Sequence, residues 1–439
     1  MRRTHHVLAS AAGITALALA AAACSSSSSG TTPAAPTVPG ITATTITIGS
    51  HQPLTGIAAY PYAEIAPAAN AYFQYVNANG GIYGRKIKYI YIDDGYNPAN
   101  TVSVVNKLVL QDNVFAIFNG LGTPTHLAVV KTLNAQKIPD VFVATGCSCF
   151  QNPAVYPDTF GWQLNYIREG KILGTYIKSH FPGKKIGYFY QGDDFGLNGV
   201  KGLDDVIPAK SVVARVPYNV AAANPAQEVG AAAAKLKAAG AQVVVSFSVP
   251  AFTALLRLSE LGVKFNPTNV VSDVGSDPTT LATLLNSFAK KKGSFGSALT
   301  QGIITDGYLP PLGDMSNPWV ALTEKVLKQY DAKAPLDGNT YYGVAVAYTF
   351  VQAMIKAGKN VTRQGLINAI NGGLPQGFSV APYLYSATDH SGMTGAYMAI
   401  IKGNVLSPLG GVFTTDVTPT GAVTPESVSQ PPPPTSGIP

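Results

Sequence analysis

Charged residues are scarce in this chain of 439 residues. Lys, Arg, Asp and Glu make up 12% of it, and the formal net charge is +7. The only tight basic runs are Lys184-Lys185 and residues 290–292, whereas a nucleic-acid-binding surface needs clustered Arg and Lys with stacking aromatic side chains. Both runs are therefore expected to be solvated surface, and no nucleic-acid partner is predicted.

Cysteine is also rare, with three residues in the chain. Cys24 lies near the N-terminus, and the other two form Cys147-Ser148-Cys149. The histidines beyond the N-terminal segment stand far apart, at positions 51, 126, 180 and 390. No set of cysteines and histidines has the spacing of a metal site, so the sequence predicts neither a metal site nor a cofactor.

Residues 1–23 have the features of an export signal peptide. Arg2 and Arg3 precede an uncharged apolar run at residues 7–23, which ends in small residues directly before Cys24. This run is shorter than the roughly 20 apolar residues that a membrane-spanning helix needs, and it is followed by serines instead of basic residues. We therefore expect the segment to be cleaved.

Ala21-Ala22-Ala23-Cys24 resembles the lipobox of bacterial lipoproteins, in which the cysteine receives a diacylglyceryl group and becomes the mature N-terminus. Two acyl chains give stable anchoring where one gives only reversible binding. The resemblance implies an exported protein that Cys24 holds at the outer face of the cytoplasmic membrane. Because Ala21 stands where this pattern more often has Leu, secretion with a free Cys24 stays open as an alternative.

Two segments are rich in Ser, Thr, Pro and Gly, namely residues 24–44 and residues 415–439. Such a composition buries too little apolar surface to fold. We expect the first segment to be a flexible tether and the second to be a disordered tail.

Between these segments, β-rich runs alternate with helical patterns, which is the sequence sign of parallel sheets with crossover helices. A strand at residues 46–50, a helix at residues 65–77 and a strand at residues 86–93 are typical, and the pattern restarts near residue 170. The length exceeds one hydrophobic core. The predicted fold class is α/β, with two doubly wound, Rossmann-like lobes.

The predicted N-terminal lobe contains residues 45–162 and 303–380, because the helices after residue 303 are too many for one lobe. The predicted C-terminal lobe contains residues 163–302 and 381–414. A chain that leaves a lobe and returns to it makes several crossings, so a multi-strand hinge is expected.

The chain resembles the type I periplasmic binding proteins, in particular the leucine/isoleucine/valine-binding branch. The resemblance rests on motifs that keep their order and spacing over residues 45–412, and each motif alone is a weak signal. The motifs are Ile46-Thr47-Ile48-Gly49, Pro53-Leu54-Thr55-Gly56, the run from Val76 to Gly84, the run from Asp93 to Pro98, and the run from Ala357 to Arg363. The resemblance implies a substrate-binding protein of an ABC transporter, which captures a small ligand by hinge closure and docks on a permease.

The best candidate for ligand binding follows the predicted strand at residues 114–118. Ligands in open α/β sheets bind beyond the carboxyl ends of strands, and here Gly122 permits close approach while Thr123 and Pro124 suit a helix start. By resemblance, Thr123 holds a ligand carboxylate; a plain N-cap is the alternative. The end of the next strand, Ala144-Thr145-Gly146-Cys147, matches a family segment that contacts the ligand through its backbone.

The resemblance implies further contacts from both lobes. Tyr60 or Tyr62 stands where the family has an aromatic wall, and Phe195 and Ser248 stand at closing positions of the C-terminal lobe. Amino-acid-binding relatives carry a carboxylate for the ammonium group where direct alignment gives Val274. Asp273 is one residue away and can replace it if the loop shifts; a loop-capping role is the alternative.

Cys147 and Cys149 lie beside this segment in an oxidising compartment, where thiols tend to pair. Residues two apart in a strand have a marginal separation for a disulfide, so pairing needs a bend near Gly146. Both the disulfide and the free thiols stay open.

Two other classes of protein are alternatives to a solute-binding protein. An enzyme with Cys147 as nucleophile would need a nearby base, and no histidine flanks the thiol, so no enzymatic activity is expected. A ligand-sensing module that reports to a membrane partner shares the fold, and fold does not fix function. The family resemblance implies a branched-chain amino acid as the ligand, and amides and aromatic acids are the alternatives.

Overall fold

The computed structural model describes residues 38–439. The predicted signal peptide, the proposed lipid anchor Cys24 and most of the predicted tether lie outside the described residues. Within residues 38–439, no helix combines the length and the apolar character needed to cross a membrane.

The N-terminal lobe is built on a sheet of five parallel strands in the order β2-β1-β3-β4-β5. Ile46 and Ile48 of β1 are buried, and so is every residue of β3 and β4, as expected for a parallel sheet covered on both faces. The strands are β1 (Thr45–Gln52), β2 (Lys86–Asp93), β3 (Ile117–Phe118), β4 (Asp140–Val143) and β5 (Thr159–Gly161).

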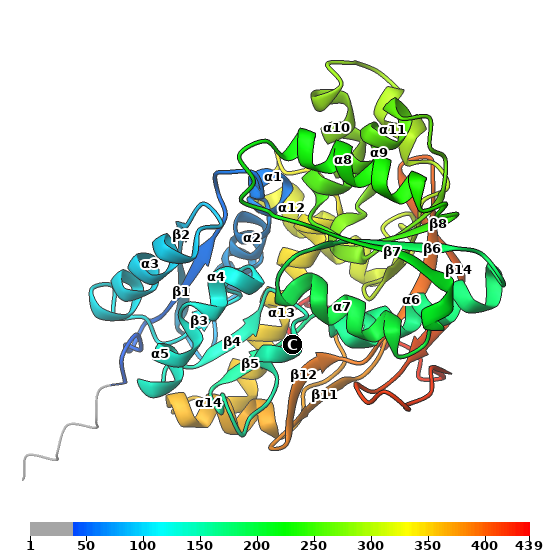
Figure 1. Ribbon diagram of the computed structural model, residues 1–439. Coiled ribbons are helices and arrows are strands. Elements are labelled where there is room, and N and C mark those ends of the chain that lie inside the picture. The colour runs from blue at the N-terminus through cyan, green and yellow to red at the C-terminus, as the bar shows by residue number, and fades with distance from the viewer. Residues whose placement is uncertain (1–37) are drawn as a thin grey trace, which may run out of the picture. The chain divides into compact units, whose positions relative to one another are not determined.

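Helices cover this sheet, and three helices of the lobe come from late in the sequence (Figure 1). The longest, α13 (Gly338–Ala357), packs along α2 (Ile65–Ala78). Asn97 caps α3 through its side chain, as the Asn97-Pro98 pair predicts. The other helices of this lobe are α1 (Ala59–Tyr62), α3 (Pro98–Leu110), α4 (Thr123–Leu127), α5 (Val130–Ala135), α12 (Pro318–Tyr330) and α14 (Arg363–Asn371).

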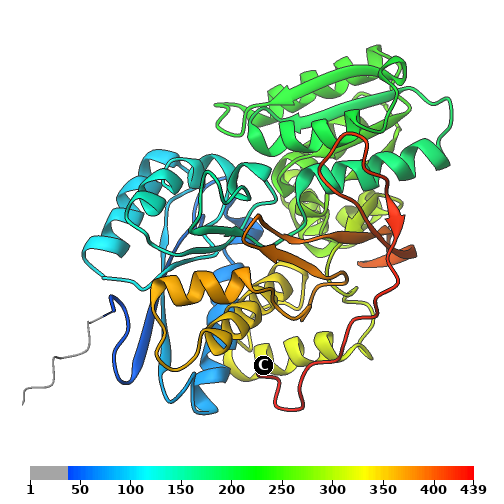
Figure 2. The same cartoon turned by 90° about the horizontal axis from the view of Figure 1, so that it is seen from below.

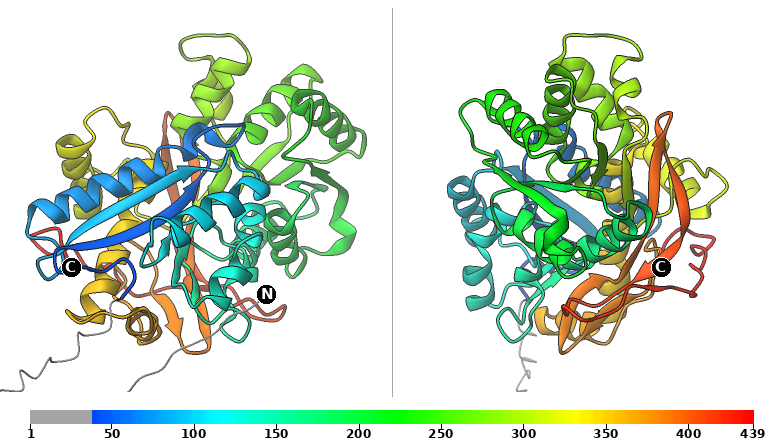
Figure 3. Two further views of the ribbon diagram at one scale, coloured as in Figure 1. Left: turned by 90° about the vertical axis from the view of Figure 1, so that its left-hand side faces the viewer. Right: turned by 45° about the vertical axis from the view of Figure 1, so that its right-hand side comes forward.

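The C-terminal lobe has a sheet of eight strands in the order β15-β14-β13-β10-β9-β8-β6-β7. The half from β7 to β10 is parallel, and the half from β10 to β15 is antiparallel. The right-hand view of Figure 3 brings the long strands β13 and β14 to the front in orange. The strands are β6 (Ile186–Gln191), β7 (Val212–Tyr218), β8 (Val243–Phe247), β9 (Thr268–Val271), β10 (Ile304–Gly307), β13 (Gly395–Lys402), β14 (Val405–Thr414) and β15 (Thr424–Pro425).

Six helices accompany the parallel half of this sheet, and α6 packs on α7. They are α6 (Tyr166–His180), α7 (Asp194–Asp204), α8 (Pro225–Ala238), α9 (Pro250–Gly262), α10 (Pro278–Phe288) and α11 (Phe295–Thr300). The predicted α/β fold with two lobes is confirmed.

Two predicted lobe boundaries are wrong. Strand β10 pairs with β9 and β13 of the C-terminal lobe, so the chain returns to the N-terminal lobe after Gly307 and not at residue 303. Strands β11 (Tyr383–Ser386) and β12 (Asp389–Met393) form a small antiparallel sheet that contacts β5 and α14, so the next crossing comes after residue 393 and not at residue 381. An apolar strand in the sequence does not reveal which sheet will accept it, which is why both boundaries were misplaced.

The prediction of a disordered tail is also wrong. After β15 pairs with β14, residues 426–439 run to the N-terminal lobe (Figure 2). There Trp319 Nε1 donates to the carbonyl oxygen of Pro431 at 2.8 Å, and the Tyr72 hydroxyl donates to that of Gly437 at 2.8 Å. The C-terminal segment has few apolar residues, but its backbone carbonyl groups accept hydrogen bonds from buried side chains of the N-terminal lobe. Amino-acid composition does not predict such backbone contacts.

Candidate functional site

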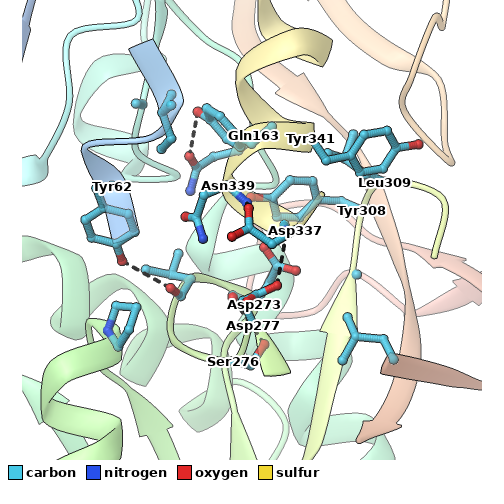
Figure 4. Close-up of a pocket in the computed structure, with 18 of the residues that line it drawn as sticks. Tyr62, Gln163, Asp273, Ser276, Asp277, Tyr308, Leu309, Asp337, Asn339 and Tyr341 are labelled. Carbon is cyan, nitrogen blue, oxygen red and sulfur yellow. Dashed lines mark hydrogen bonds between the residues drawn. The ribbon is translucent and has the colours of Figure 1, made fainter. Parts of the chain in front are cut away.

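A cavity of about 220 Å³ lies between the two lobes, and both lobes line it (Figure 4). The N-terminal lobe contributes residues that follow its strands and begin its helices, and the C-terminal lobe contributes the ends of β8, β9 and β10. Among the lining residues are Tyr62, Ile65, Tyr96, Leu121, Gly122, Thr123, Ala144, Thr145, Gln163, Tyr166, Phe195, Val249, Pro250, Asp273, Val274, Ser276, Asp277, Tyr308, Asp337, Asn339, Tyr341, Tyr342 and Tyr397.

Two threonine hydroxyl groups meet at one wall of the cavity. Thr123 is the first residue of α4 and Thr145 follows β4, and their Oγ1 atoms are 2.6 Å apart. Thr145 also donates to the hydroxyl of Tyr166 at 3.4 Å. Each hydroxyl carries one proton and can accept two bonds, so Thr123 binds a ligand oxygen as a donor when its proton turns from Thr145 toward the cavity.

The backbone beside this wall requires glycine at one position. Gly122 has a φ of 103°, and a Cβ atom there would lie 2.5 Å from Thr125 Oγ1 and 2.5 Å from Tyr96 Cε2. Its N–H donates to the carbonyl oxygen of Ala144 at 3.3 Å, which ties the ends of β3 and β4 together. The missing side chain therefore lets the Tyr96 ring approach the backbone at the cavity wall.

A group of carboxyls stands on the C-terminal lobe side. Asp273 follows β9, and its backbone N–H donates to Glu169 Oε1 at 2.9 Å and to Asp306 Oδ1 at 3.1 Å. Burial, reinforced by the charge of Asp273, raises the pKa of Glu169 to about 7. Burial and the neighbouring Asp306 carboxyl raise the pKa of Asp273, and burial next to Glu169 raises that of Asp306. The three carboxyls lie close together, since the backbone N–H of Asp273 donates to both Glu169 and Asp306.

Aromatic side chains share the remaining wall with aliphatic and proline side chains. Asp193 accepts a hydrogen bond from the N–H of Phe195 at 3.0 Å and so places Phe195 at the start of α7. The Phe195 and Tyr166 ring centroids are 4.8 Å apart. The Tyr342 hydroxyl donates to Gln163 Oε1 at 3.0 Å, which fixes both side chains at the cavity.

Hydrogen bonds also join the two lobes directly around the cavity. The Tyr62 hydroxyl donates to the carbonyl oxygen of Val274 at 3.1 Å. The N–H of Gly338, in the first turn of α13, donates to Asp277 Oδ2 at 3.0 Å. Ser148 Oγ donates to Asn198 Oδ1 at 2.6 Å. These contacts favour a closed arrangement of the lobes.

Seven of the predicted ligand-binding residues line the cavity together. They are Tyr62, Gly122, Thr123, Ala144, Thr145, Phe195 and Asp273. Of the two tyrosine candidates, Tyr62 lines the cavity, whereas Tyr60 does not and is 37% exposed. Both Asp273 and Val274 line it, so the loop brings the carboxylate to the cavity even though direct alignment gives valine.

Three further predicted residues do not reach the cavity wall. Ser248 is fully buried, and its hydroxyl pairs with Thr253 Oγ1 at 2.8 Å, so it adds no polar group to the cavity. Gly146 does not line the cavity, and its carbonyl oxygen accepts from the N–H of Tyr166 at 2.9 Å, at the start of α6. Cys147 is fully buried behind that turn. The strand end turns away from the cavity after Thr145.

Cys147 and Cys149 form a disulfide, with their Cα atoms 5.2 Å apart. The bend that this pairing needs is a turn of 3-10 helix over Ser148–Phe150. The disulfide lies next to the Ser148 contact with Asn198 in the other lobe.

Several lining residues were missed from the sequence. Asp277 and Asp337 precede helices in Asp-Pro and Asp-Gly pairs, which signal helix caps, and both indeed cap helices α10 and α13. Nothing in these pairs indicates that the late crossing of the chain carries Asp337 to the cavity. Tyr308 was missed because the crossing after Gly307 was predicted at residue 303. Gln163 and Tyr341 also line the cavity, and nothing in their local sequence indicates it.

Two histidines that are isolated in the sequence are neighbours in the structure. His51 Nε2 and His126 Nδ1 are 3.0 Å apart, and the outer nitrogens contact Asp94 at 2.8 Å and Asp140 at 2.7 Å. All four side chains are buried under the cavity wall and none lines it. In residues 38–439, no three His, Cys, Asp or Glu side chains are arranged to hold a metal ion.

Comparison with known proteins identifies the family. The model of a family described as "Periplasmic binding protein" matches residues 45–404. A curated relative, "Leu/Ile/Val-binding protein homolog 3" from Brucella melitensis, is 27% identical over 210 residues. That match covers 45% of this chain and 53% of the relative, so the similarity spans about half the length of the curated relatives.

Solved structures show the same fold. A branched-chain amino acid ABC transporter protein from Thermus thermophilus with bound valine has a TM-score of 0.73 at 18% identity, over 85% of this chain and 97% of that one. A fatty acid ABC transporter substrate-binding protein from Thermomonospora curvata has a TM-score of 0.70 at 21% identity, over 87% and 95%. Together with the family match, the chain therefore belongs to the type I periplasmic binding proteins, in the family that includes the leucine/isoleucine/valine-binding proteins.

Proposed function

We propose that this chain is the extracytoplasmic solute-binding lipoprotein of an ABC importer and that it captures a small amino-acid-like ligand by closing its two lobes. The observation that carries the proposal is the cavity itself. It presents the hydroxyls of Thr123 and Thr145 from one lobe and the carboxyl of Asp273 from the other. A ligand with a carboxylate and an ammonium group can contact both lobes at once.

Ligand-dependent closure supports this assignment. A ligand shifts an open–closed equilibrium only when it binds one state better than the other. Here the complementary polar groups belong to different lobes, so both contact the ligand only in the closed state. The hydrogen bonds from Tyr62 to Val274 and from Gly338 to Asp277 add to the closed state independently of the ligand.

The relatives give the default ligand. The Brucella protein is named for leucine, isoleucine and valine, and the Thermus structure contains valine. We therefore propose a branched-chain amino acid or a related molecule as the starting point for a ligand search.

We also propose that the protein binds without catalysing a reaction. The thiols considered as nucleophiles are joined in the Cys147–Cys149 disulfide. A disulfide sulfur has no thiolate to attack a substrate.

The ligand proposal is tested by thermal-shift screening and calorimetry of the purified full chain. The panel contains L-leucine, L-valine, their amides and aromatic acids. Selective binding to the folded state raises the melting temperature by mass action. Binding of an α-amino acid that Asp273→Asn weakens at least 10-fold supports the proposal, and no shift with any panel member contradicts it.

Import and anchoring need separate tests. Cys24→Ser should release the protein from the membrane fraction, and reconstitution with its cognate ABC permease and ATPase should give ligand-stimulated ATP hydrolysis. Membrane retention of the Cys24→Ser variant would contradict the lipid anchor. Ligand-dependent signalling without uptake would favour the sensing alternative.

A further inference from the structure

The turn that contains the Cys147–Cys149 disulfide contacts helix α7 of the opposite lobe. The backbone N–H and the hydroxyl of Ser148 both donate to Asn198 Oδ1, at 3.0 and 2.6 Å. The Cys147 Sγ atom lies 4.0 Å from the carbonyl oxygen of Asp194, the first residue of α7. Helices α4 and α7 also face each other here (Figure 1). The disulfide-bonded turn therefore joins the two lobes at a place outside the cavity.

The disulfide restricts the residue that makes this contact. Asn198 Oδ1 accepts two hydrogen bonds from one residue, so the N–H and the hydroxyl of Ser148 must point the same way. The disulfide keeps the Cα atoms of Cys147 and Cys149 5.2 Å apart, and the 3-10 turn begins at the residue between them. Because Ser148 is the middle residue of this closed ring, its backbone has little freedom to turn away from Asn198.

The short loop indicates that the disulfide acts on local geometry. A disulfide stabilises a fold mainly by restricting the unfolded chain, and this effect grows with the number of residues in the closed loop. Cys147 and Cys149 are separated by 2 positions in the sequence, so the unfolded chain is restricted very little. The position of Ser148 is therefore what the disulfide changes most.

The same contact is connected to the cavity wall on both sides. In the N-terminal lobe, the N–H of Cys147 donates to Thr145 Oγ1 at 3.2 Å, and Thr145 lines the cavity. In the C-terminal lobe, Phe195 lines the cavity and precedes Asn198 by one helical turn on the same face of α7. A movement of the turn relative to α7 therefore changes the distance between two parts of the cavity wall.

We propose that Ser148 and Asn198 are positioning residues for closure and that the Cys147–Cys149 disulfide makes their contact redox-sensitive. With the disulfide formed, Ser148 is held against Asn198 and the closed state is favoured. With the disulfide reduced, the turn is free to leave Asn198, so closure and ligand affinity become weaker. The inference rests on the proposed function, because closure of the lobes is the capture step.

The redox step is a thiol–disulfide exchange with a dithiol. Cys149 is partly exposed, whereas Cys147 is fully buried, so a thiolate of the dithiol attacks Cys149 Sγ and Cys147 leaves as a thiolate, which takes up a proton. The second thiol of the dithiol then attacks its own sulfur in the mixed disulfide and releases Cys149 as a thiol. The dithiol ends as a cyclic disulfide, and the protein gains two electrons and two protons.

The test is calorimetry of the full chain with L-leucine before and after treatment with dithiothreitol, with a count of free thiols to verify reduction. The closed state loses two hydrogen bonds to Asn198, so the affinity should fall by about 5-fold or more. If the disulfide of the folded chain resists dithiothreitol, the Cys147→Ser/Cys149→Ser variant takes the place of the reduced protein.

Asn198→Ala shows whether the disulfide acts through this contact. The variant removes the acceptor of both bonds, so it should bind L-leucine as weakly as the reduced protein, and reduction should then have no further effect. Asn286→Ala is the matched control, because Asn286 Oδ1 also accepts a backbone N–H, that of Gly296 at 2.9 Å, within the C-terminal lobe. A disulfide that only stabilised the fold would give effects of reduction and Asn198→Ala that add.

A second measurement needs no ligand. Small-angle X-ray scattering of the ligand-free chain reports how far the lobes are open. Reduction and Asn198→Ala should each increase the radius of gyration, and Asn286→Ala should not. The increase should be the same for the reduced protein, for Asn198→Ala and for reduced Asn198→Ala.

The outcomes separate this inference from the proposed function. If L-leucine binds equally well before and after reduction, or if the effects of reduction and Asn198→Ala add, the redox-sensitive contact is wrong and the proposed function stands. If L-leucine binds to no form of the chain, the branched-chain default is wrong, and the scattering comparison alone decides the inference. In that case an unchanged radius of gyration after reduction overturns it.

Discussion

The hydroxyl of Tyr62 in the N-terminal lobe donates a hydrogen bond of 3.1 Å to the carbonyl oxygen of Val274 in the C-terminal lobe. Both residues line the cavity, so this hydrogen bond joins the two lobes at the cavity wall. Tyr62→Phe removes it and keeps the ring. Because such a bond contributes about 0.5–1.5 kcal/mol, ligand affinity should fall about 2- to 10-fold by calorimetry.

Tyr83→Phe is the control for this variant. The Tyr83 hydroxyl also donates to a carbonyl oxygen, that of Ile355 at 2.7 Å, but both residues belong to the N-terminal lobe. Its loss should leave affinity unchanged. Equal affinity in the two variants would mean that the Tyr62 bond does not contribute to closure.

The Thr123 hydroxyl is expected to receive a ligand carboxylate at the wall that it shares with Thr145. Thr123→Val keeps the shape and removes the hydroxyl. Hydrogen bonds to charged groups contribute about 1.5–3 kcal/mol, so affinity for an amino acid should fall by roughly 10- to 100-fold, while affinity for its amide should change less. Thr323→Val is the control, because the Thr323 hydroxyl bonds to the Trp319 carbonyl oxygen within α12. Full affinity in Thr123→Val would place the carboxylate elsewhere.

The sequence predicted the parts of this site that follow a strand directly. Thr123 could be found because ligands bind beyond the strand ends of a parallel sheet and a glycine-rich loop before a helix start is a local signal, whereas Thr145 came from resemblance to a family segment. Asp273 came from resemblance. Asp277 and Asp337 could not be identified as cavity residues, because the local sequence of each predicts only a helix cap. The chain crossing after Gly307 brings the start of α13, with Asp337, next to Asp277. Long-range chain crossings leave no local pattern, so the position of these two carboxyls at the cavity could not be predicted.

The buried carboxyls predict that stability falls as the pH rises toward neutrality. The pKa of Glu169 is raised to about 7 from an ordinary value of 4.5, mainly by burial. Below about pH 4.5, the Glu169 carboxyl is protonated in both the folded and the unfolded chain, so its burial does not lower the free energy of unfolding. Between pH 4.5 and 7, the carboxyl loses its proton in the unfolded chain but keeps it in the folded chain, so the free energy of unfolding falls as the pH rises. Above about 7 the penalty is constant.

Melting temperatures measured between pH 4.5 and 8 test this behaviour. Glu169→Gln should show a weaker decline than the unmodified protein, because one of the titrating carboxyls is gone. Glu324→Gln is the control, since Glu324 lies on the surface of α12 and pairs with Lys328. An identical decline in all three proteins would exclude Glu169 as a source of the pH dependence.

The pair of His51 and His126 should contribute to stability and not to ligand binding. His126→Phe keeps a ring but leaves the buried His51 Nε2 without a partner and removes one of the two hydrogen bonds at Asp140 Oδ2, where the bond from Thr159 remains. A buried group without a partner costs about 1–3 kcal/mol and a lost hydrogen bond about 0.5–1.5 kcal/mol, so urea denaturation should show a loss of about 2–4 kcal/mol. His180→Phe, on the exposed face of α6, should be nearly neutral. A neutral His126→Phe would mean that other groups or water replace the lost bonds.

The C-terminal segment should act as a structural strap and not as a loose tail. Lys171 of the C-terminal lobe contacts Asp416 at 3.1 Å, while Trp319 and Tyr72 of the N-terminal lobe donate to Pro431 and Gly437. A chain that ends at residue 429 loses the latter two bonds, each worth about 1 kcal/mol, and exposes the Trp319 edge. Its melting temperature should therefore fall by several degrees, whereas Val428→Ala, an exposed change in the same segment, should have no effect. An unchanged melting temperature after truncation would show that these contacts only offset the entropy of ordering the segment.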